Sequence, residues 1–182
     1  AETIVAAKKN KTRPMSLASA IEKDQVVGQF MSPARHTHAC LWERGKPRDL
    51  DQADSPWSSA WAVNGKGDVI GELRLEQDQS IQAFLWTKGT LTQLPGIGGN
   101  ESHALSLNDA GLVAGYATNR LHQTHAVLWE DRKPRVLKTV EDGLPASQAL
   151  ALNDRGEAVG SCFGPKFGVA VRWKDGEHPE AL

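Results

Sequence analysis

The sequence predicts an all-β protein, a four-bladed β-propeller built from four repeats of about 44 residues that each form four strands. Three markers recur with this one period: an Ala-x-x-Trp motif, a polar turn that ends in glycine, and a Ser-x-Ala-x-x motif that ends in an apolar residue. Because three independent markers keep the same period, we treat the chain, residues 1–182, as a single propeller domain. Its blades are expected at about 16–56, 57–100, 101–145 and 146–182.

The markers fall at equivalent positions in all four copies. The serine motif begins at Ser16, Ser58, Ser102 and Ser147. The turn motif ends at Gly28, Gly71, Gly115 and Gly160, and the tryptophan motif ends at Trp42, Trp86, Trp129 and Trp173. The first copy departs most from the others, because its turn is one residue shorter and lacks asparagine.

The third copy shows why one repeat predicts four strands. "SHALSL" (102–107) alternates small and large residues, which is a strand pattern. "NDAG" (108–111) is typical of a tight hairpin turn. "LVAGYA" (112–117), "THAVLW" (124–129) and "RVLKTV" (135–140) supply three further strands between polar turns. A four-stranded sheet has two faces to cover, and packing between two neighbouring blades covers both.

Two terminal segments compete for one strand position. "TIVAA" (3–7) and "HPEAL" (178–182) both fall where the fourth strand of the last blade is expected. The N-terminal segment would close the ring by completing that blade. The alternatives are that one segment is loose, that the chain is part of a larger propeller, or that two chains pair into an eight-bladed ring.

Composition and charge exclude several classes of protein. The net charge is −1 and no concentrated basic face is evident, so nucleic-acid binding is not expected. No apolar run reaches the roughly 18 residues of a membrane span, so membrane insertion is not expected either. The chain begins Ala1-Glu2, and small residues flank signal-peptide cleavage sites, which fits a mature exported chain and equally a shortened sequence. We expect a periplasmic or extracellular protein.

The two cysteines leave two alternatives open. Cys40 and Cys162 belong to the first and last blades, which touch in a closed four-bladed ring, and a disulfide between them would fit an exported protein. The other interpretation is two separate buried thiols, because free cysteine packs as a small hydrophobic residue. Two cysteines are too few for a structural zinc site, and we expect no metal or other cofactor.

Five residues are candidates for ligand binding. The four motif serines, Ser16, Ser58, Ser102 and Ser147, would place hydroxyls around one mouth of the central channel, where they could hold water, an ion or a small polar ligand. The alternative is that each hydroxyl bonds to local backbone. Trp57 follows "DQADSP" in an expected loop, where it is either a contact residue or a cover for the blade edge. The four repeat tryptophans are expected to fill the gaps between blades.

No arrangement of residues predicts catalysis. The sequence lacks a phosphate loop, zinc-ligand spacing and a nucleophile elbow. The histidines of two matching loops are expected at the surface or at strand ends rather than on a metal: His36, His38, His122 and His125. A hydrolase would depend on acids scattered through turns, of which Glu101 is the best candidate: Asp54, Asp78, Glu101 and Glu141. We therefore predict that the protein is not an enzyme and assign it no catalytic residues.

Several segments resemble the bacterial HAF repeat, often described as an extracellular repeat. The matching segments are "QAFLW" (82–86), "LPGIGG" (94–99), "SHALSLNDAGLVAG" (102–115) and "THAVLW" (124–129). Copy one is the most eroded, and copy four has "GVAVRW" in place of the His-Ala form. The resemblance implies a β-propeller-like repeat protein that is frequently exported. It implies no reaction and no catalytic residues.

Together these observations favour a non-catalytic binding protein that presents one loop-rich face to a protein or glycan partner, for example as an inhibitor or immunity protein. The variable loops expected on that face are 29–37, 51–57, 72–81 and 117–124. The chain is expected to be a monomer or a homodimer. The alternative function is a structural assembly module that dimerises through incomplete closure of the propeller.

Overall fold

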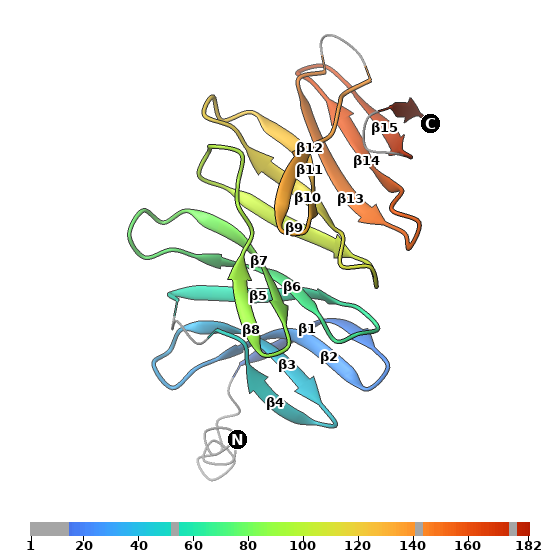
Figure 1. Ribbon diagram of the computed structural model, residues 1–182. Coiled ribbons are helices and arrows are strands. Elements are labelled where there is room, and N and C mark those ends of the chain that lie inside the picture. Colours follow the sequence, from blue (N-terminus) through green and yellow to red (C-terminus); the bar gives the residue numbers. More distant parts are fainter. Residues whose placement is uncertain (1–14, 52–54, 141–143, 175–177) are drawn as a thin grey trace.

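The computed structural model describes residues 15–51, 55–140, 144–174 and 178–182, and every regular element within these ranges is a β-strand. The strands fall into four consecutive groups of four, which we call units 1 to 4 (Figure 1). The prediction of an all-β fold is therefore confirmed. The terminal segment 3–7, expected to complete the last blade, lies outside the described residues.

The strand boundaries follow the period of the repeat. Unit 1 consists of β1 (Ser16–Glu22), β2 (Gln25–Met31), β3 (Thr37–Glu43) and β4 (Lys46–Asp49). Unit 2 consists of β5 (Trp57–Val63), β6 (Val69–Arg74), β7 (Ile81–Thr87) and β8 (Thr90–Gln93). Unit 3 consists of β9 (Ser102–Leu107), β10 (Val113–Thr118), β11 (Thr124–Glu130) and β12 (Lys133–Val136). Unit 4 consists of β13 (Ala146–Leu152), β14 (Ala158–Phe163), β15 (Gly168–Trp173) and β16 (Pro179–Ala181).

Each unit is an antiparallel meander in which consecutive strands pair. Units 3 and 4 are separate four-stranded sheets, whereas units 1 and 2 are joined by one parallel pair between Thr37 of β3 and Trp57 of β5. An equivalent bridge joins Ile81 to Glu101 at the next junction. The first strand of a unit therefore begins beside the third strand of the unit before it.

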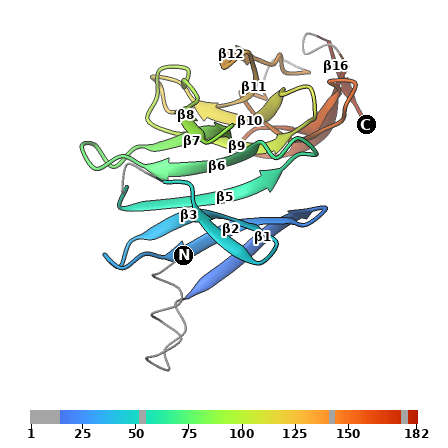
Figure 2. The same ribbon diagram turned by 60° about the horizontal axis from the view of Figure 1, so that its bottom comes forward.

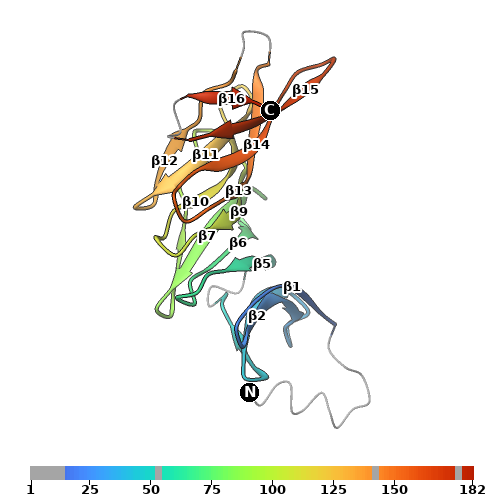
Figure 3. The same ribbon diagram turned by 90° about the vertical axis from the view of Figure 1, so that its right-hand side faces the viewer.

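The units follow one another in a row. Each of units 2 to 4 begins with a strand that packs against the second and third strands of the unit before it: β5 against β2 and β3, β9 against β6 and β7, and β13 against β10 and β11. Units 1 and 4 lie at opposite ends of this row (Figures 1 and 3), and the stacking of the sheets is seen edge-on in Figure 2. Among the described residues the row does not close into a ring.

The hydrophobic core is divided into three clusters, and each cluster lies between two neighbouring units. One cluster joins Val27 and Leu41 of unit 1 to Phe84 and Trp86 of unit 2. The other two repeat this pattern between units 2 and 3 and between units 3 and 4. The tryptophan that ends the motif is almost fully buried in units 2 to 4, with exposed fractions of 5 %, 1 % and 0 %. Burial of both faces of a sheet thus depends on its neighbours, as in other repeat architectures.

The motif glycine is explained by a repeated β-bulge. Each first strand shifts register where it pairs with the motif glycine of the second strand: Gly28, Gly71, Gly115 and Gly160. A Cβ atom built on Gly115 would lie 1.9 Å from the carbonyl oxygen of His103, and the other three glycines meet the equivalent oxygen at 1.9 to 2.0 Å. The bulge therefore brings two backbones so close that no side chain fits.

Candidate binding site

The strand connections divide the molecule into two ends. The hairpin end carries the turns between first and second strands and between third and fourth strands. The loop end carries the remaining connections, including the variable segments that we expected to form the binding face: 29–37, 51–57, 72–81 and 117–124. Residues 52–54 of this set lie outside the described residues.

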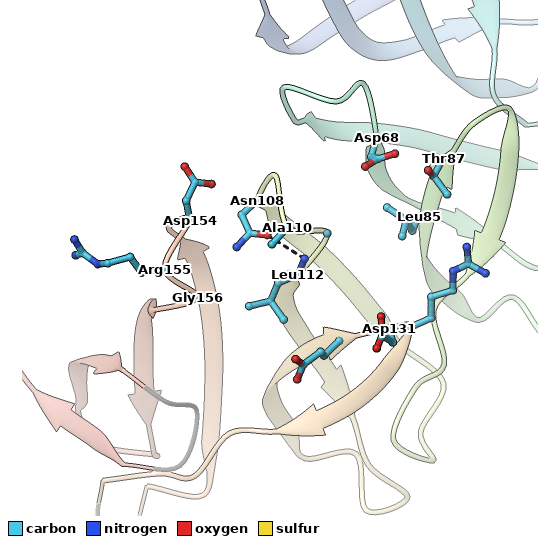
Figure 4. Close-up of a pocket in the computed structure, with 13 residues that line it drawn as sticks. Asp68, Leu85, Thr87, Asn108, Ala110, Leu112, Asp131, Asp154, Arg155 and Gly156 are labelled. Carbon is cyan, nitrogen blue, oxygen red and sulfur yellow. Dashed lines mark hydrogen bonds between the residues drawn. The ribbon is translucent and has the colours of Figure 1, made fainter.

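A cavity of about 440 Å³ opens at the hairpin end, between the turns of units 2, 3 and 4 (Figure 4). Its walls are three turns, 108–112, 130–132 and 154–156, together with Asp68 and Thr87 of unit 2. A second cavity of about 500 Å³ lies over units 1 and 2 and is also lined by Asp68 and Thr87. Because the two cavities adjoin, we treat them together as the hairpin groove.

The two parts of the hairpin groove differ in charge. The part over units 2 to 4 is lined by four carboxylates and two guanidinium groups: Asp68, Glu130, Asp131, Asp154, Arg132 and Arg155. The part over units 1 and 2 is lined by three cations and two carboxylates: Arg48, Lys66, Lys88, Glu43 and Asp68. Such a surface is complementary to a ligand that carries both signs of charge.

An asparagine ladder links the turns of units 2, 3 and 4 beside the hairpin groove. Asn64 donates from Nδ2 to the carbonyl oxygen of Asn108 (3.0 Å), and Asn108 donates in the same way to Asn153 (3.0 Å). The Oδ1 atom of each of these asparagines accepts amide hydrogens from its own turn. Gly65 also donates its amide hydrogen to Oδ1 of Asp109 (2.7 Å). The sequence predicted these residues as turn formers. It did not reveal that they also form hydrogen bonds that link neighbouring units.

One wall of the hairpin groove has a strained backbone. The hairpin between β11 and β12 has Asp131 (φ 49°) and Arg132 (φ 65°) at its tip, both in the left-handed region. The equivalent hairpins have glycine at the second position, Gly45 and Gly89. A residue with a side chain costs roughly 1–2 kcal/mol in this conformation. Strain of this kind concentrates at functional sites, and here both residues line the cavity.

Local hydrogen bonds keep Arg155 and Glu157 charged in the turn between β13 and β14. Arg155 donates to Oε2 of Glu157 from Nη2 (2.7 Å) and Nε (3.1 Å). These bonds raise the pKa of Arg155 and, together with a bond from Asn153, lower the pKa of Glu157. Both side chains therefore stay charged at neutral pH, and Arg155 is held beside Asp154 at the rim.

The motif serines lie inside the molecule rather than at a channel mouth. Ser58, Ser102 and Ser147 are 0 % exposed. Each hydroxyl accepts an amide hydrogen from the alanine that begins the Ala-x-x-Trp motif of the preceding unit, which we call the motif alanine. The donors are Ala39 (3.0 Å), Ala83 (2.9 Å) and Ala126 (2.9 Å) respectively. With no exposed surface, these three hydroxyls are not available to a ligand in this structure. Ser16 belongs to the first of the described units and is exposed.

Trp57 does not lie in a loop. It is the first residue of β5, half-buried, and it pairs with Arg74 of β6 and with Thr37 of β3. The expected loop position is thus wrong, because the first strand of unit 2 begins one residue earlier than the motif serine. Its role as a contact residue stays a prediction.

The histidines and acids form pairs rather than a metal site. His38 bonds through Nδ1 to Oδ2 of Asp49 (2.9 Å). His103 bonds to Glu72 and stacks on Tyr116, with Oε2 of Glu101 3.9 Å from its Nε2 atom. Burial, followed by the charges of Glu72 and Glu101, raises the pKa of Tyr116. Within the described ranges no cluster of three His, Cys, Asp or Glu side chains is arranged to hold a metal ion.

The other proposed hydrolase acids are not gathered around Glu101. Asp78 is fully exposed in a loop, where hydrogen bonds from Ser80 lower its pKa. Asp54 and Glu141 lie outside the described residues. Glu101 itself lines neither part of the hairpin groove.

Both cysteines are free thiols in this structure. Cys40 and Cys162 are buried in units 1 and 4, at opposite ends of the row. The disulfide alternative required these two units to touch. Burial raises the pKa of Cys40 to about 12 and also raises that of Cys162, so neither thiol ionises at neutral pH.

The chain matches no family model and no curated protein sequence. The described residues contain no candidate for a membrane-spanning helix.

Proposed function

We propose that this chain is a non-catalytic binding module that holds a protein partner in the hairpin groove. The observation that carries the proposal is a groove of two adjoining cavities lined by turns of all four units, with the asparagine ladder linking the turns of units 2, 3 and 4. Its size lies within the range of ordinary ligand sites. The turn at Asp131 and Arg132 keeps charged side chains at the rim although glycine would relieve the strain.

The charge pattern favours a protein over a glycan. Carboxylates outnumber guanidinium groups over units 2 to 4, by four to two, and amino and guanidinium groups outnumber carboxylates over units 1 and 2, by three to two. A protein segment with a basic part followed by an acidic part would be complementary along the groove, whereas a neutral glycan offers no charge that complements this pattern. An inhibitor or immunity protein would use such a surface to cover a partner's active site.

The proposal also covers the type of repeat and the location of the protein. We take the four units to be propeller blades of the HAF-repeat type, open within one chain, and the protein to be periplasmic or extracellular. The agreement of the strand groups with the sequence repeat supports the blade interpretation. The hydrolase alternative has less support, because Glu101 and its neighbours line neither cavity.

Charge reversal tests the proposed function. The variant Glu130→Lys/Asp131→Lys changes the acidic wall, and Asp78→Lys is the matched control because it reverses an exposed acid at the loop end. Immobilised wild-type protein and both variants are exposed to the envelope fraction of the native organism, and retained proteins are quantified by mass spectrometry. We expect one partner retained by the wild type and by Asp78→Lys but lost by the double variant.

Two outcomes contradict the proposed function. One is a retained protein that the double variant binds as well as the wild type does. The other is binding of neutral oligosaccharides, measured by calorimetry, that the double variant leaves unchanged.

A further inference from the structure

We propose that copies of this chain join head to tail, with unit 4 of one copy packed against unit 1 of the next as neighbouring units pack within the chain. The proposal is independent of the hairpin groove. It depends on the two end faces, which carry the two halves of a junction that the chain forms three times internally. We call the exposed face of unit 4 the tail face and that of unit 1 the head face.

The tail face repeats positions that are buried in every other unit. Three positions of units 1 to 3 contact the next unit: the motif alanine, the residue before the motif glycine, and the leucine after the fourth strand. All nine residues at these positions are at most 1 % exposed: Ala39, Ala83, Ala126, Val27, Ile70, Ala114, Leu50, Leu94 and Leu137. In unit 4 the equivalent Val159 is 39 % exposed and Leu182 is 76 % exposed. Ala170 is also exposed.

The head face shows the complementary set. In units 2 to 4 the serine and the alanine of the Ser-x-Ala motif are 0 % exposed: Ser58, Ser102, Ser147, Ala60, Ala104 and Ala149. The apolar residue that ends this motif packs against the core cluster shared with the preceding unit: Val63, Leu107 and Leu152. In unit 1 the equivalent Ser16 and Ala18 are exposed, and Ile21 is 70 % exposed.

One hydrogen bond recurs at every internal junction. The motif alanine donates its amide hydrogen to the motif serine of the next unit, at 2.9 to 3.0 Å in all three cases. Ala170 has the same register as Ala126, since it lies opposite Ser161 as Ala126 lies opposite Tyr116. The Ala170 amide on the tail face and the Ser16 hydroxyl on the head face are therefore a matched donor and acceptor.

The new junction differs from the internal ones at one position. Arg172 stands where units 1 to 3 have a buried leucine, Leu41, Leu85 or Leu128. Its Nη2 atom donates to Glu180 (3.0 Å), while its Nε atom has no hydrogen-bond partner among the described residues. A charge on the tail face reduces the apolar area, so we expect reversible association that depends on concentration rather than a permanent complex.

A head-to-tail contact joins two different surfaces, and it produces a ring where the rotation closes and a growing chain where it does not. A symmetric dimer instead joins two identical surfaces. This difference allows a mixing experiment to identify the contact. The variant Ile21→Glu alters the head face alone, and Val159→Glu alters the tail face alone. Leu121→Glu is the control, because Leu121 is 76 % exposed in a loop away from both faces.

The mass of the full chain is measured by sedimentation velocity from ~1 µM to ~200 µM, the range in which modest interfaces assemble. We expect the wild type and Leu121→Glu to form dimers or larger species with rising concentration. Each face variant alone should stay monomeric. An equimolar mixture of the two face variants should form a dimer, because each retains the face that the other has lost, and this recovery also shows that both are folded.

Three results would overturn the proposal. The first is a wild-type chain that stays monomeric throughout the concentration range. The second is a mixture of face variants that does not associate. The third is association that either face variant alone retains in full.

Discussion

At the scale of single residues, the β-bulge in each first strand requires glycine at the motif position of the second strand. We expect Gly115→Ala to destabilise the protein by about 1–3 kcal/mol, because the added Cβ would meet the His103 carbonyl oxygen at 1.9 Å. Chemical denaturation of the two proteins measures this difference. Gly96→Ala is the matched control, since a Cβ there has no neighbour within 4 Å. Equal losses for both variants would show that the close approach at Gly115 is not the cause.

The buried thiol of Cys40 makes stability depend on pH in the alkaline range. Burial raises its pKa from 9.0 to about 12, so the folded state holds this proton more tightly than the unfolded state. The resulting stability is complete below pH 9.0 and is lost as the pH rises from there towards about 12. We expect Cys40→Ala to show a flatter decline of the urea midpoint above pH 9.0. A variant whose midpoint falls as steeply as that of the wild type would contradict this explanation.

The serines show how far residue-level prediction from sequence extends. Their recurrence at one repeat position was visible in the sequence, and so was the recurrence of the motif alanines. What the sequence did not reveal is that Ser102 and Ala83 meet, because a contact between units depends on how the units stack. The sequence therefore left two alternatives for these hydroxyls, a channel mouth or a bond to local backbone, whereas three of them are buried between units. The groove carboxylates were missed for the same reason.

At the scale of strands and turns, the serine bond should hold neighbouring units together. We expect Ser147→Ala to cost about 1–3 kcal/mol of unfolding free energy, because it leaves the buried amide of Ala126 without an acceptor. Ser16→Ala changes the same repeat position where it is exposed, and it should leave the stability of the dilute monomer unchanged. Urea denaturation of both variants checks the pair. A neutral Ser147→Ala would mean that the bond contributes nothing to the junction.

The strained hairpin between β11 and β12 gives a second prediction at this scale. Arg132→Gly should stabilise the protein by about 1 kcal/mol, because glycine accepts the left-handed conformation without steric cost. The same change at Lys133, a strand residue of β12, should instead lower stability by about 0.5–1 kcal/mol. Thermal or urea denaturation distinguishes the two. If Arg132→Gly is destabilising, contacts of the arginine outweigh the strain.

At the scale of the whole molecule, the repeat predicted the four units but not their closure. The period places strands correctly because each marker sits at a fixed point in the meander, from Ser102 to Trp129 in unit 3. Closure depends on the small rotation between successive units, which accumulates over the row and which no marker in the sequence specifies. The described units thus form an open row in which each core belongs to two neighbours.

The amide hydrogens of the motif alanines test this open row most directly. Hydrogen exchange is followed by NMR at a protein concentration low enough to keep the chain monomeric. We expect strong protection at Ala39, Ala83 and Ala126, which donate to buried serines, and rapid exchange at Ala170, which faces no further unit in the row. Strong protection at Ala170 in the monomer, or rapid exchange at Ala126, would contradict the account.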